Sequence, residues 1–363
     1  MELFPGDKPV IQICRRSEDT GVSELPAPGW YYRLSAFFKE KFNEKIYKIP
    51  LDAGFSCPNR DGTLSTKGCI FCYNPSFSPG ALLREKGGAE LSIREQILRF
   101  QFRHEKAPGN TEPGTPPGDF IPRRKYLAYF QSYSNTYAPV DRLKELYEEA
   151  LQVPGIVGLS IATRPDCLSR EVLELLSGYA RRCHLWLELG LQSAHDATLR
   201  LINRGHSYAQ FREAVLNSRS RGIYLCVHVI NGLPGEGREQ MLETIRRINS
   251  LPLDGIKFHQ LQVFRNTPLE RLYRQNRFRV LTLQEYLEIL CSQLEILRPD
   301  IVVHRLLAEA TEDDVLLAPH WRSSRALFSQ LVEKELINRR SYQGKKYKAP
   351  PLREIKKDKT GDY

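Results

Sequence analysis

The stretch KIYKIPLDAGFSCPNRDGTLSTKGCIFC, residues 45–72, joins a short apolar run to three cysteines. Residues 45–52 contain β-branched and aromatic side chains in the density that predicts a strand. Eleven residues separate Cys57 from Cys69 and two separate Cys69 from Cys72, while the other five of the chain's eight cysteines are scattered. Three thiols are one too few for a closed zinc site and too unevenly placed for a disulfide framework. This loop therefore predicts a metal centre with one open coordination position.

Five further runs of the same kind follow this first predicted strand. They cover residues 125–133, 155–163, 184–192, 224–232 and 255–264. Helical patterns lie between them, at residues 92–103, 140–152, 169–182, 195–203 with 208–221, and 237–250. Strands that alternate with helices form a parallel sheet with right-handed crossovers. Six units are too few for a closed eight-unit barrel, so we expect an α/β fold: a partial, open six-unit β/α barrel.

The expected barrel also predicts where the cysteine loop lies. In barrels of this kind the chemistry takes place at the carboxyl ends of the strands. Because the loop directly follows strand 45–52, we place it at that mouth. Asp141 and Ser169 stand near the starts of helices 140–152 and 169–182, where such side chains act as caps.

Two ends and one insertion differ in composition from this core. Residues 1–28 are polar and aperiodic, and residues 104–122 hold proline and glycine in a density that neither helix nor strand tolerates. We therefore expect an N-terminal extension at 1–28 and a barrel at 29–310 that carries a flexible insertion at 104–122. A basic C-terminal extension, helical segment and tail, should follow at 311–363.

Charge and hydropathy narrow the class of protein. No run of 18 apolar residues and no apolar signal core occurs, and the cysteines suit a reducing compartment, so we expect a cytoplasmic protein without a membrane partner. The net charge is +10, and residues 322–363 hold twelve Lys or Arg against five Asp or Glu. A basic end that also carries aromatic residues suits phosphate binding; a solvated tail is the alternative.

The choice of metal follows from ligand chemistry. Soft thiolates select zinc or an iron–sulfur cluster. Zinc needs a fourth ligand, for which Cys14 and His104 are distant options. A [4Fe–4S] cluster with three cysteines keeps one iron open. S-adenosylmethionine can chelate that iron, and reduction then cleaves it to a 5′-deoxyadenosyl radical, with Phe71 shielding the cluster. Spacing alone leaves zinc and cluster open.

The order of these motifs resembles the radical S-adenosylmethionine superfamily, and within it the Elongator-like branch with its small bacterial YhcC/YtqA-type proteins. The resemblance covers roughly residues 30–345. Most superfamily members have three residues between the first two cysteines, but this branch has a longer gap, and CPNRDGTLSTKGCIFC looks like its version. The resemblance implies that Cys57, Cys69 and Cys72 bind a [4Fe–4S] cluster, with S-adenosylmethionine as the second cofactor.

The resemblance also implies cofactor contacts at the strand ends. YFQSYSNTYAP (129–139) matches the region where relatives hold the amino and carboxylate end of the cofactor, although the glycine pair common there is missing. The candidates in this stretch are Ser132, Tyr133, Ser134 and Asn135. ATRPDCL (162–168) is similar to the branch's own motif, but Ala162 stands where many relatives carry a glutamate for the ribose.

Further candidates end the fourth and fifth predicted strands. LELGLQS (187–193) supplies Glu188 and Gln192, and the latter matches a glutamine that relatives use near the cofactor. Arg204, twelve residues on, matches an arginine that pairs with the cofactor carboxylate; closing a helix is its alternative role. His228 stands where some relatives place an aspartate, and a satisfied core histidine is the alternative.

The substrate is the least determined feature. The Elongator-like branch is linked to the wobble uridine of transfer RNA, so the resemblance implies tRNA as partner, with a flavodoxin or ferredoxin as electron donor. APHWRSSRALFSQLVEKELINRRSYQGKKY (318–347) mixes aromatic and basic residues, a composition that suits nucleic-acid stacking and charge. The alternatives are a radical enzyme acting on a small molecule, such as a tetrapyrrole precursor, and a zinc-stapled nucleic-acid-binding protein without catalysis.

Overall fold

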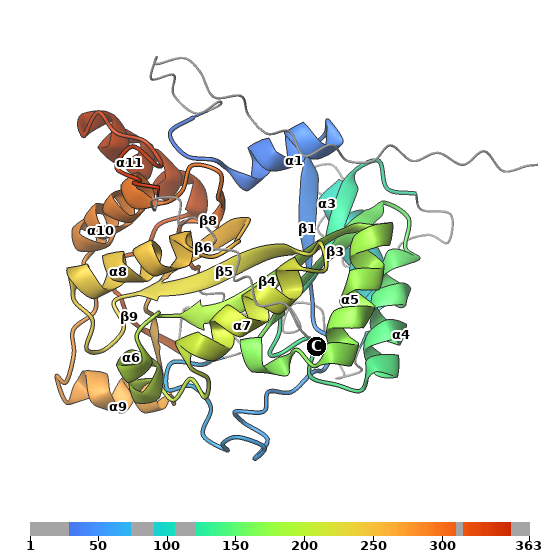
Figure 1. Cartoon of the computed structure of the whole chain (residues 1–363), viewed down its shortest axis with the longest axis horizontal. Coiled ribbons are helices and arrows are strands. Elements are labelled where there is room, and N and C mark those ends of the chain that lie inside the picture. Colours follow the sequence, from blue (N-terminus) through green and yellow to red (C-terminus); the bar gives the residue numbers. More distant parts are fainter. Residues whose placement is uncertain (1–28, 74–90, 106–120, 310–314, 350–363) are drawn as a thin grey trace, which may run out of the picture.

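A curved parallel sheet forms the centre of the molecule (Figure 1). The computed structural model describes residues 29–73, 91–105, 121–309 and 315–349. Within these ranges the sheet has seven strands in the order β1-β2-β3-β4-β5-β6-β8, and each neighbouring pair is parallel. The strands are β1 (Ile46–Leu51), β2 (Lys125–Phe130), β3 (Ile156–Thr163), β4 (His184–Gln192), β5 (Tyr224–Asn231), β6 (Gly255–Gln260) and β8 (Val302–Arg305).

Helices connect successive strands and cover the outer face of the sheet, where Figure 1 shows α4, α5, α7 and α8 along its length. Their bounds are α3 (Ile93–Glu105), α4 (Val140–Leu151), α5 (Arg170–Arg182), α6 (Asp196–Leu201), α7 (Tyr208–Arg219), α8 (Arg238–Asn249) and α10 (Leu283–Ile296). The apolar stripe of α4 is buried as its spacing predicts, and its Tyr147 ring meets Phe130 of β2 edge-on at 5.1 Å. This layering is the core of an open α/β barrel.

The six predicted strands are confirmed, with two differences. The run 255–264 divides into β6 and the short β7 (Val263–Phe264), which pairs antiparallel with β9 (Leu316–Ala318). The additional strand β8 extends the sheet beyond β6, and its four residues are too few to show a pattern in the sequence. The helices α1 (Leu34–Phe42), α9 (Pro268–Arg274) and α10 were likewise not predicted; α10 is buried on most sides and so lacks an amphipathic stripe.

Helix α1 closes the amino end of the barrel. Phe38 of α1 packs in one cluster with residues near the starts of five strands, Ile46, Leu127, Trp186, Cys226 and Val302. The preceding segment pairs with β8, where the Val303 backbone N–H donates to the Tyr32 carbonyl at 2.7 Å. With the amino end filled by aromatic and aliphatic side chains, the interior remains accessible from the carboxyl end.

The flanking segments are only partly described. Residues 1–28, 106–120 and 350–363 lie outside the described residues, so the N-terminal extension, most of the predicted insertion and the last part of the tail are not tested, nor are the domain boundaries. The predicted C-terminal helical segment contains α11 (Arg325–Asn338), which buries Phe328 against Tyr286 of α10 at 5.5 Å. Within the described ranges, no helix is long and apolar enough to cross a bilayer.

Replacing Ser169 by alanine is expected to lower the free energy of unfolding by about 1 kcal/mol, because its hydroxyl caps α5 by accepting from the Val172 N–H at 3.3 Å. Asp141 is not a cap: it lies inside α4, whose N-cap residue is Pro139, so that prediction is wrong. Asp141→Ala is the matched control and should cost less in urea unfolding. Equal losses in both variants would contradict the cap assignment.

Candidate functional site

A cavity of about 220 Å³ opens among the carboxyl ends of the strands. Its wall includes Thr163 at the end of β3, Gln192 at the end of β4 and Gln260 at the end of β6. Nine of the predicted site residues line it: Cys57, Cys69, Cys72, Tyr133, Ser134, Glu188, Gln192, Arg204 and His228. The cysteine loop therefore lies at the mouth where the sequence places it.

The loop between Cys57 and Cys69 folds back on itself. The Arg60 N–H donates to the Cys57 carbonyl at 2.8 Å, and the Gly68 N–H donates to the Asn59 carbonyl at 2.7 Å. The Asn59 side chain in turn donates to the Asn203 carbonyl at 2.6 Å, which ties the loop to the segment after β4. The eleven residues between Cys57 and Cys69 therefore form an ordered loop that returns the chain toward the first cysteine.

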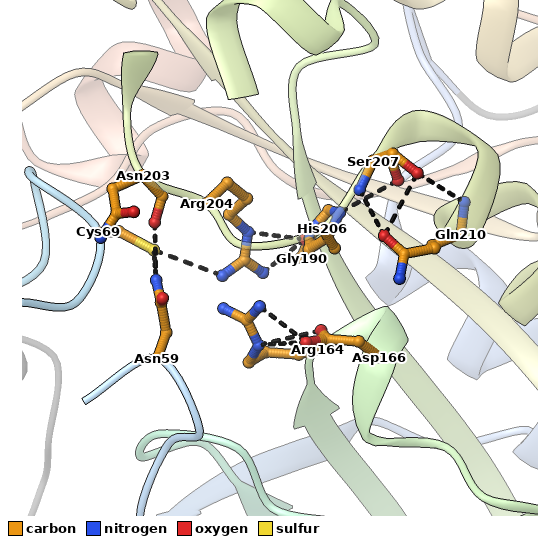
Figure 2. Close-up of polar contacts among 10 residues, drawn as sticks. All are labelled: Asn59, Cys69, Arg164, Asp166, Gly190, Asn203, Arg204, His206, Ser207 and Gln210. Carbon is orange, nitrogen blue, oxygen red and sulfur yellow. Dashed lines mark hydrogen bonds and ion pairs between the residues drawn. The ribbon is translucent and has the colours of Figure 1, made fainter. Parts of the chain in front are cut away.

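Basic and amide groups face the cysteine sulfurs. Cys69 Sγ accepts from Asn59 Nδ2 at 3.5 Å and from Arg204 Nη1 at 3.6 Å, as Figure 2 shows, and Cys72 Sγ accepts from Arg60 Nη1 at 3.7 Å. Burial raises the pKa of the Cys72 thiol to about 11, and neighbouring Cys69 raises it as well, whereas the two arginines lower it. Three thiols on one cavity wall become stable thiolates when a metal centre supplies positive charge. The donor set fits a thiolate-ligated metal centre.

The described part of the chain does not gather the ligands of a single zinc ion around one point. Among the described residues, no three His, Cys, Asp or Glu side chains lie close enough together to hold one metal ion. His104, a suggested fourth ligand, packs instead against Tyr47 at 4.6 Å and Tyr126 at 6.0 Å, near the starts of β1 and β2 and away from the mouth. The other option, Cys14, lies outside the described residues. A larger, multi-iron cluster can be held by thiols that do not converge on one point.

Arg204 connects the cysteine loop to β4. Its Nη2 and Nε donate to the Gly190 carbonyl at 2.6 and 3.2 Å, and His206 Nε2 lies 3.1 Å from the same oxygen (Figure 2). β4 is irregular here, and the following Gln192 has φ +76°, a conformation that side chains rarely adopt. The guanidinium therefore spans from β4 to Cys69, and Arg204 also closes α6 through its backbone N–H, which donates to the Leu199 carbonyl at 2.9 Å. Direct cofactor contacts of Arg204 and Gln192 stay predictions.

Arg164 is a site residue that sequence reasoning missed. It is buried, lines the cavity and pairs with Asp166 through Nη2 at 2.9 Å and Nε at 3.0 Å (Figure 2). Burial opposes its charged form, but Asp166, Cys69 and Cys57 outweigh burial and raise its pKa. Its Nη1 is buried without a hydrogen-bond partner among the described residues. Its place in ATRPDCL, directly after β3, was the available signal.

The four candidates after β2 separate into two pairs. Tyr133, with φ +59°, and Ser134 line the cavity, but Ser132 and Asn135 are buried outside its wall. Asn135 donates from Nδ2 and from its backbone N–H to the Ala162 carbonyl, at 2.8 and 3.1 Å. It therefore holds the ends of β2 and β3 together. Direct cofactor contacts of Ser132 and Asn135, like those of Tyr133 and Ser134, stay predictions.

Glu188 and His228 lie on the cavity floor and face each other. The fully buried Glu188 carboxylate accepts from His228 Nε2 at 2.8 Å, Lys48 Nζ at 2.8 Å and Ser160 Oγ at 2.7 Å, and it also contacts Lys257. Burial alone raises the pKa of Glu188, but the two lysines outweigh burial and hold it well below its usual range. Burial lowers the pKa of His228 to about 4, so its imidazole is neutral. Cofactor binding by either residue stays a prediction.

Comparisons with known proteins agree with this geometry. The family model described as the Radical SAM superfamily matches residues 119–248, and the Radical SAM C-terminal domain matches residues 253–338. YtqA of Bacillus subtilis is 38% identical over 87% of this chain and 92% of its own length, and YhcC of Escherichia coli K12 is 36% identical over 84% and 91%.

The chain is also similar, at lower identity, to Elongator proteins. Mouse Elongator complex protein 3 is 29% identical over 41% of this chain and 27% of its own length. The solved structure of archaeal Elp3 from Methanocaldococcus infernus, with its N-terminus deleted, aligns with a TM-score of 0.57 at 16% identity, covering 82% of this chain and 64% of that one. The structural likeness shows the shared fold.

Proposed function

This chain belongs to the radical S-adenosylmethionine superfamily, among its YtqA/YhcC-type proteins, and we propose that it modifies transfer RNA with a [4Fe–4S] cluster and S-adenosylmethionine. It is therefore a radical SAM enzyme. The observation that carries the cofactor assignment is the set of three cysteines on one cavity wall at the strand ends, faced by basic and amide donors. When bound, the cluster and S-adenosylmethionine supply a 5′-deoxyadenosyl radical.

The residues around the cysteines position the two cofactors. Asn59 and Arg204 donate to Cys69 Sγ, and hydrogen bonds to ligating sulfurs orient them and adjust the reduction potential. Arg164 keeps an unpartnered Nη1 beside the same cysteines, which is a donor for the carboxylate of S-adenosylmethionine. Phe71 lines the cavity between the last two cysteines and excludes water from it.

Three features support transfer RNA as the substrate. The chain shares sequence with Elongator complex protein 3, and the resemblance to that branch implies chemistry at the wobble uridine. The net charge of +10 favours a polyanionic partner. Beside the exposed Lys345 and Lys348, the rings of Tyr342 and Tyr347 are partly exposed, and such rings can stack on nucleobases.

Filter binding of tRNA is expected to weaken steeply with salt, with a log–log slope of about −0.7 to −0.9 for each phosphate neutralised. Reversing the charge of Lys345 and Lys348 together should lower both affinity and slope, because these exposed lysines follow α11 in the basic C-terminal segment. The matched control reverses Arg142 and Lys144 on α4, which lies on the other side of the molecule (Figure 1). The assay needs no active cofactor.

The same preparation, reconstituted and reduced without oxygen, should form 5′-deoxyadenosine from S-adenosylmethionine. Cleavage of S-adenosylmethionine together with salt-insensitive tRNA binding, no tighter than that of a neutral protein, would reject the RNA substrate and leave a small molecule as the target. A colourless protein without cleavage would reject the cluster itself.

A further inference from the structure

Arg305 is a cation on the cavity wall that forms no ion pair with any described residue. It is the last residue of β8 and lines the cavity. Among the described residues, no side-chain or backbone group forms a hydrogen bond or ion pair with its guanidinium. Burial lowers the pKa of Arg305, so the surroundings oppose its charge. A guanidinium stays charged under such conditions, and the described chain provides no partner for this one.

The two described carboxylates whose charges act on Arg305, those of Glu188 and Glu309, are already occupied. Glu309 pairs with Arg325. Glu188 accepts from four side chains, which fills the positions that a carboxylate offers, and those donors are Lys48, Lys257, Ser160 and His228. Burial lowers the pKa of Lys257 to about 7, while Glu188 opposes that shift. Even with Lys257 neutral, Lys48 and Arg305 together carry one positive charge more than Glu188 neutralises.

The histidines on the floor do not change this balance. Burial lowers the pKa of His228 to about 4 and holds that of His259 well below its usual range, and the charge of Arg305 acts in the same direction on both. Both rings line the cavity, with centroids 5.4 Å apart. Neutral imidazoles do not change the net charge of the cavity. The excess positive charge therefore stays at Arg305.

We propose that the cavity floor beside Arg305 is a subsite for an oxyanion, a carboxylate or phosphate group, carried by the substrate. The planar guanidinium fork matches both groups with paired hydrogen bonds, and an anion there neutralises the charge of Arg305. This inference deepens the proposed function and rests on it for the assignment to the substrate: the nucleotide that enters the cavity bears an acidic group.

The carboxylate of S-adenosylmethionine has a different place. Arg164 and Arg204 stand beside the cysteines, one with a free Nη1 and the other 3.6 Å from Cys69 Sγ. Arg305 instead belongs to β8, at the opposite edge of the sheet order from β1, and its charge acts on Tyr129 and Glu188. The cavity therefore has two separate sets of basic residues. Arg164 and Arg204 are available to the cofactor, and Arg305 is available to the substrate.

Anion binding by the full, cluster-reconstituted protein tests this subsite without RNA. The rise in unfolding temperature with sodium phosphate or sodium acetate, at ionic strength held constant with chloride, gives an apparent Kd for each anion. Arg305→Met should weaken that Kd at least tenfold, and Arg305→Lys should weaken it less because the charge remains. Arg170→Met is the matched control: Arg170 pairs with Glu174 on α5, its side chain is 82% exposed, and its loss should leave the Kd unchanged.

Equilibrium dialysis with S-adenosylmethionine separates the two sources of an oxyanion. Unchanged cofactor binding in Arg305→Met, with anion binding lost, supports a substrate subsite, and the preferred anion shows which group the substrate bears. Equal loss of cofactor binding would assign the anion to S-adenosylmethionine and overturn the proposal. A wild-type anion Kd in Arg305→Met, or no anion effect in the parent protein, would also overturn it. Failure of tRNA binding leaves these anion constants unaffected, so the two failures are distinguishable.

Discussion

Serine in place of Cys57, Cys69 or Cys72, one variant at a time, is expected to abolish both the brown iron–sulfur absorbance and the formation of 5′-deoxyadenosine. Serine keeps the size of the side chain but replaces the soft thiolate that iron–sulfur clusters require. Each of the three cysteines lines the cavity, and the loop offers no further thiol to replace the one lost. Anaerobic visible spectra, iron content and chromatography of the reaction products measure the effect.

Cys183→Ser is the matched control for these variants. Cys183 is a partly exposed thiol just after α5, where its backbone N–H donates to the Tyr179 carbonyl, and it does not line the cavity. The control should keep the parent's iron content and activity. If one of the three loop variants retained full cleavage, that cysteine would not be a ligand; if Cys183→Ser lost the cluster, the cavity assignment would fail.

The barrel and the cysteine site were predictable because their signals are local. Apolar runs and helical spacing mark β1 to β6, and the order of motifs on consecutive strand ends brings Cys57, Cys69 and Cys72 to one mouth. The sequence patterns failed where an element is short or buried on most sides. β8 has four residues, and α10 has only a narrow polar face, with Gln284 and Glu288 exposed.

The floor of the cavity was only partly predictable. Glu188 was expected as a cofactor contact, yet Lys48 of β1 and Lys257 of β6 both reach it across the barrel. From the sequence alone, each lysine resembles an exposed strand residue, because the residues on either side of it do not show that the strands curve toward one another. Asn135 shows the same limit: it was taken from a motif, but its amide joins two strand ends. Contacts between distant strands follow from curvature, which the motifs do not encode.

Glutamine in place of Glu188 is expected to lower the free energy of unfolding by about 3–5 kcal/mol at pH 7, because the substitution leaves the buried Lys257 and the partly buried Lys48 without a counter-charge. Glu188→Gln keeps the shape of the side chain, so the loss reports charge. Glu148→Gln is the matched surface control: Glu148 pairs with Arg182, which is 59% exposed, and its loss should cost about 1 kcal/mol or less. Urea unfolding of both variants measures the difference.

The pH dependence distinguishes this explanation from a packing defect. The folded-state pKa of Glu188 is depressed, so its contribution is present above its unfolded value of about 4.5 and is lost as pH falls through the folded value. The gap between the parent and Glu188→Gln should therefore be widest near neutral pH and narrow in acid. Adding Lys257→Met should recover part of the stability, because it removes one unpaired charge. A gap that is constant with pH, with no recovery in the double variant, would show that Glu188 acts through packing rather than charge.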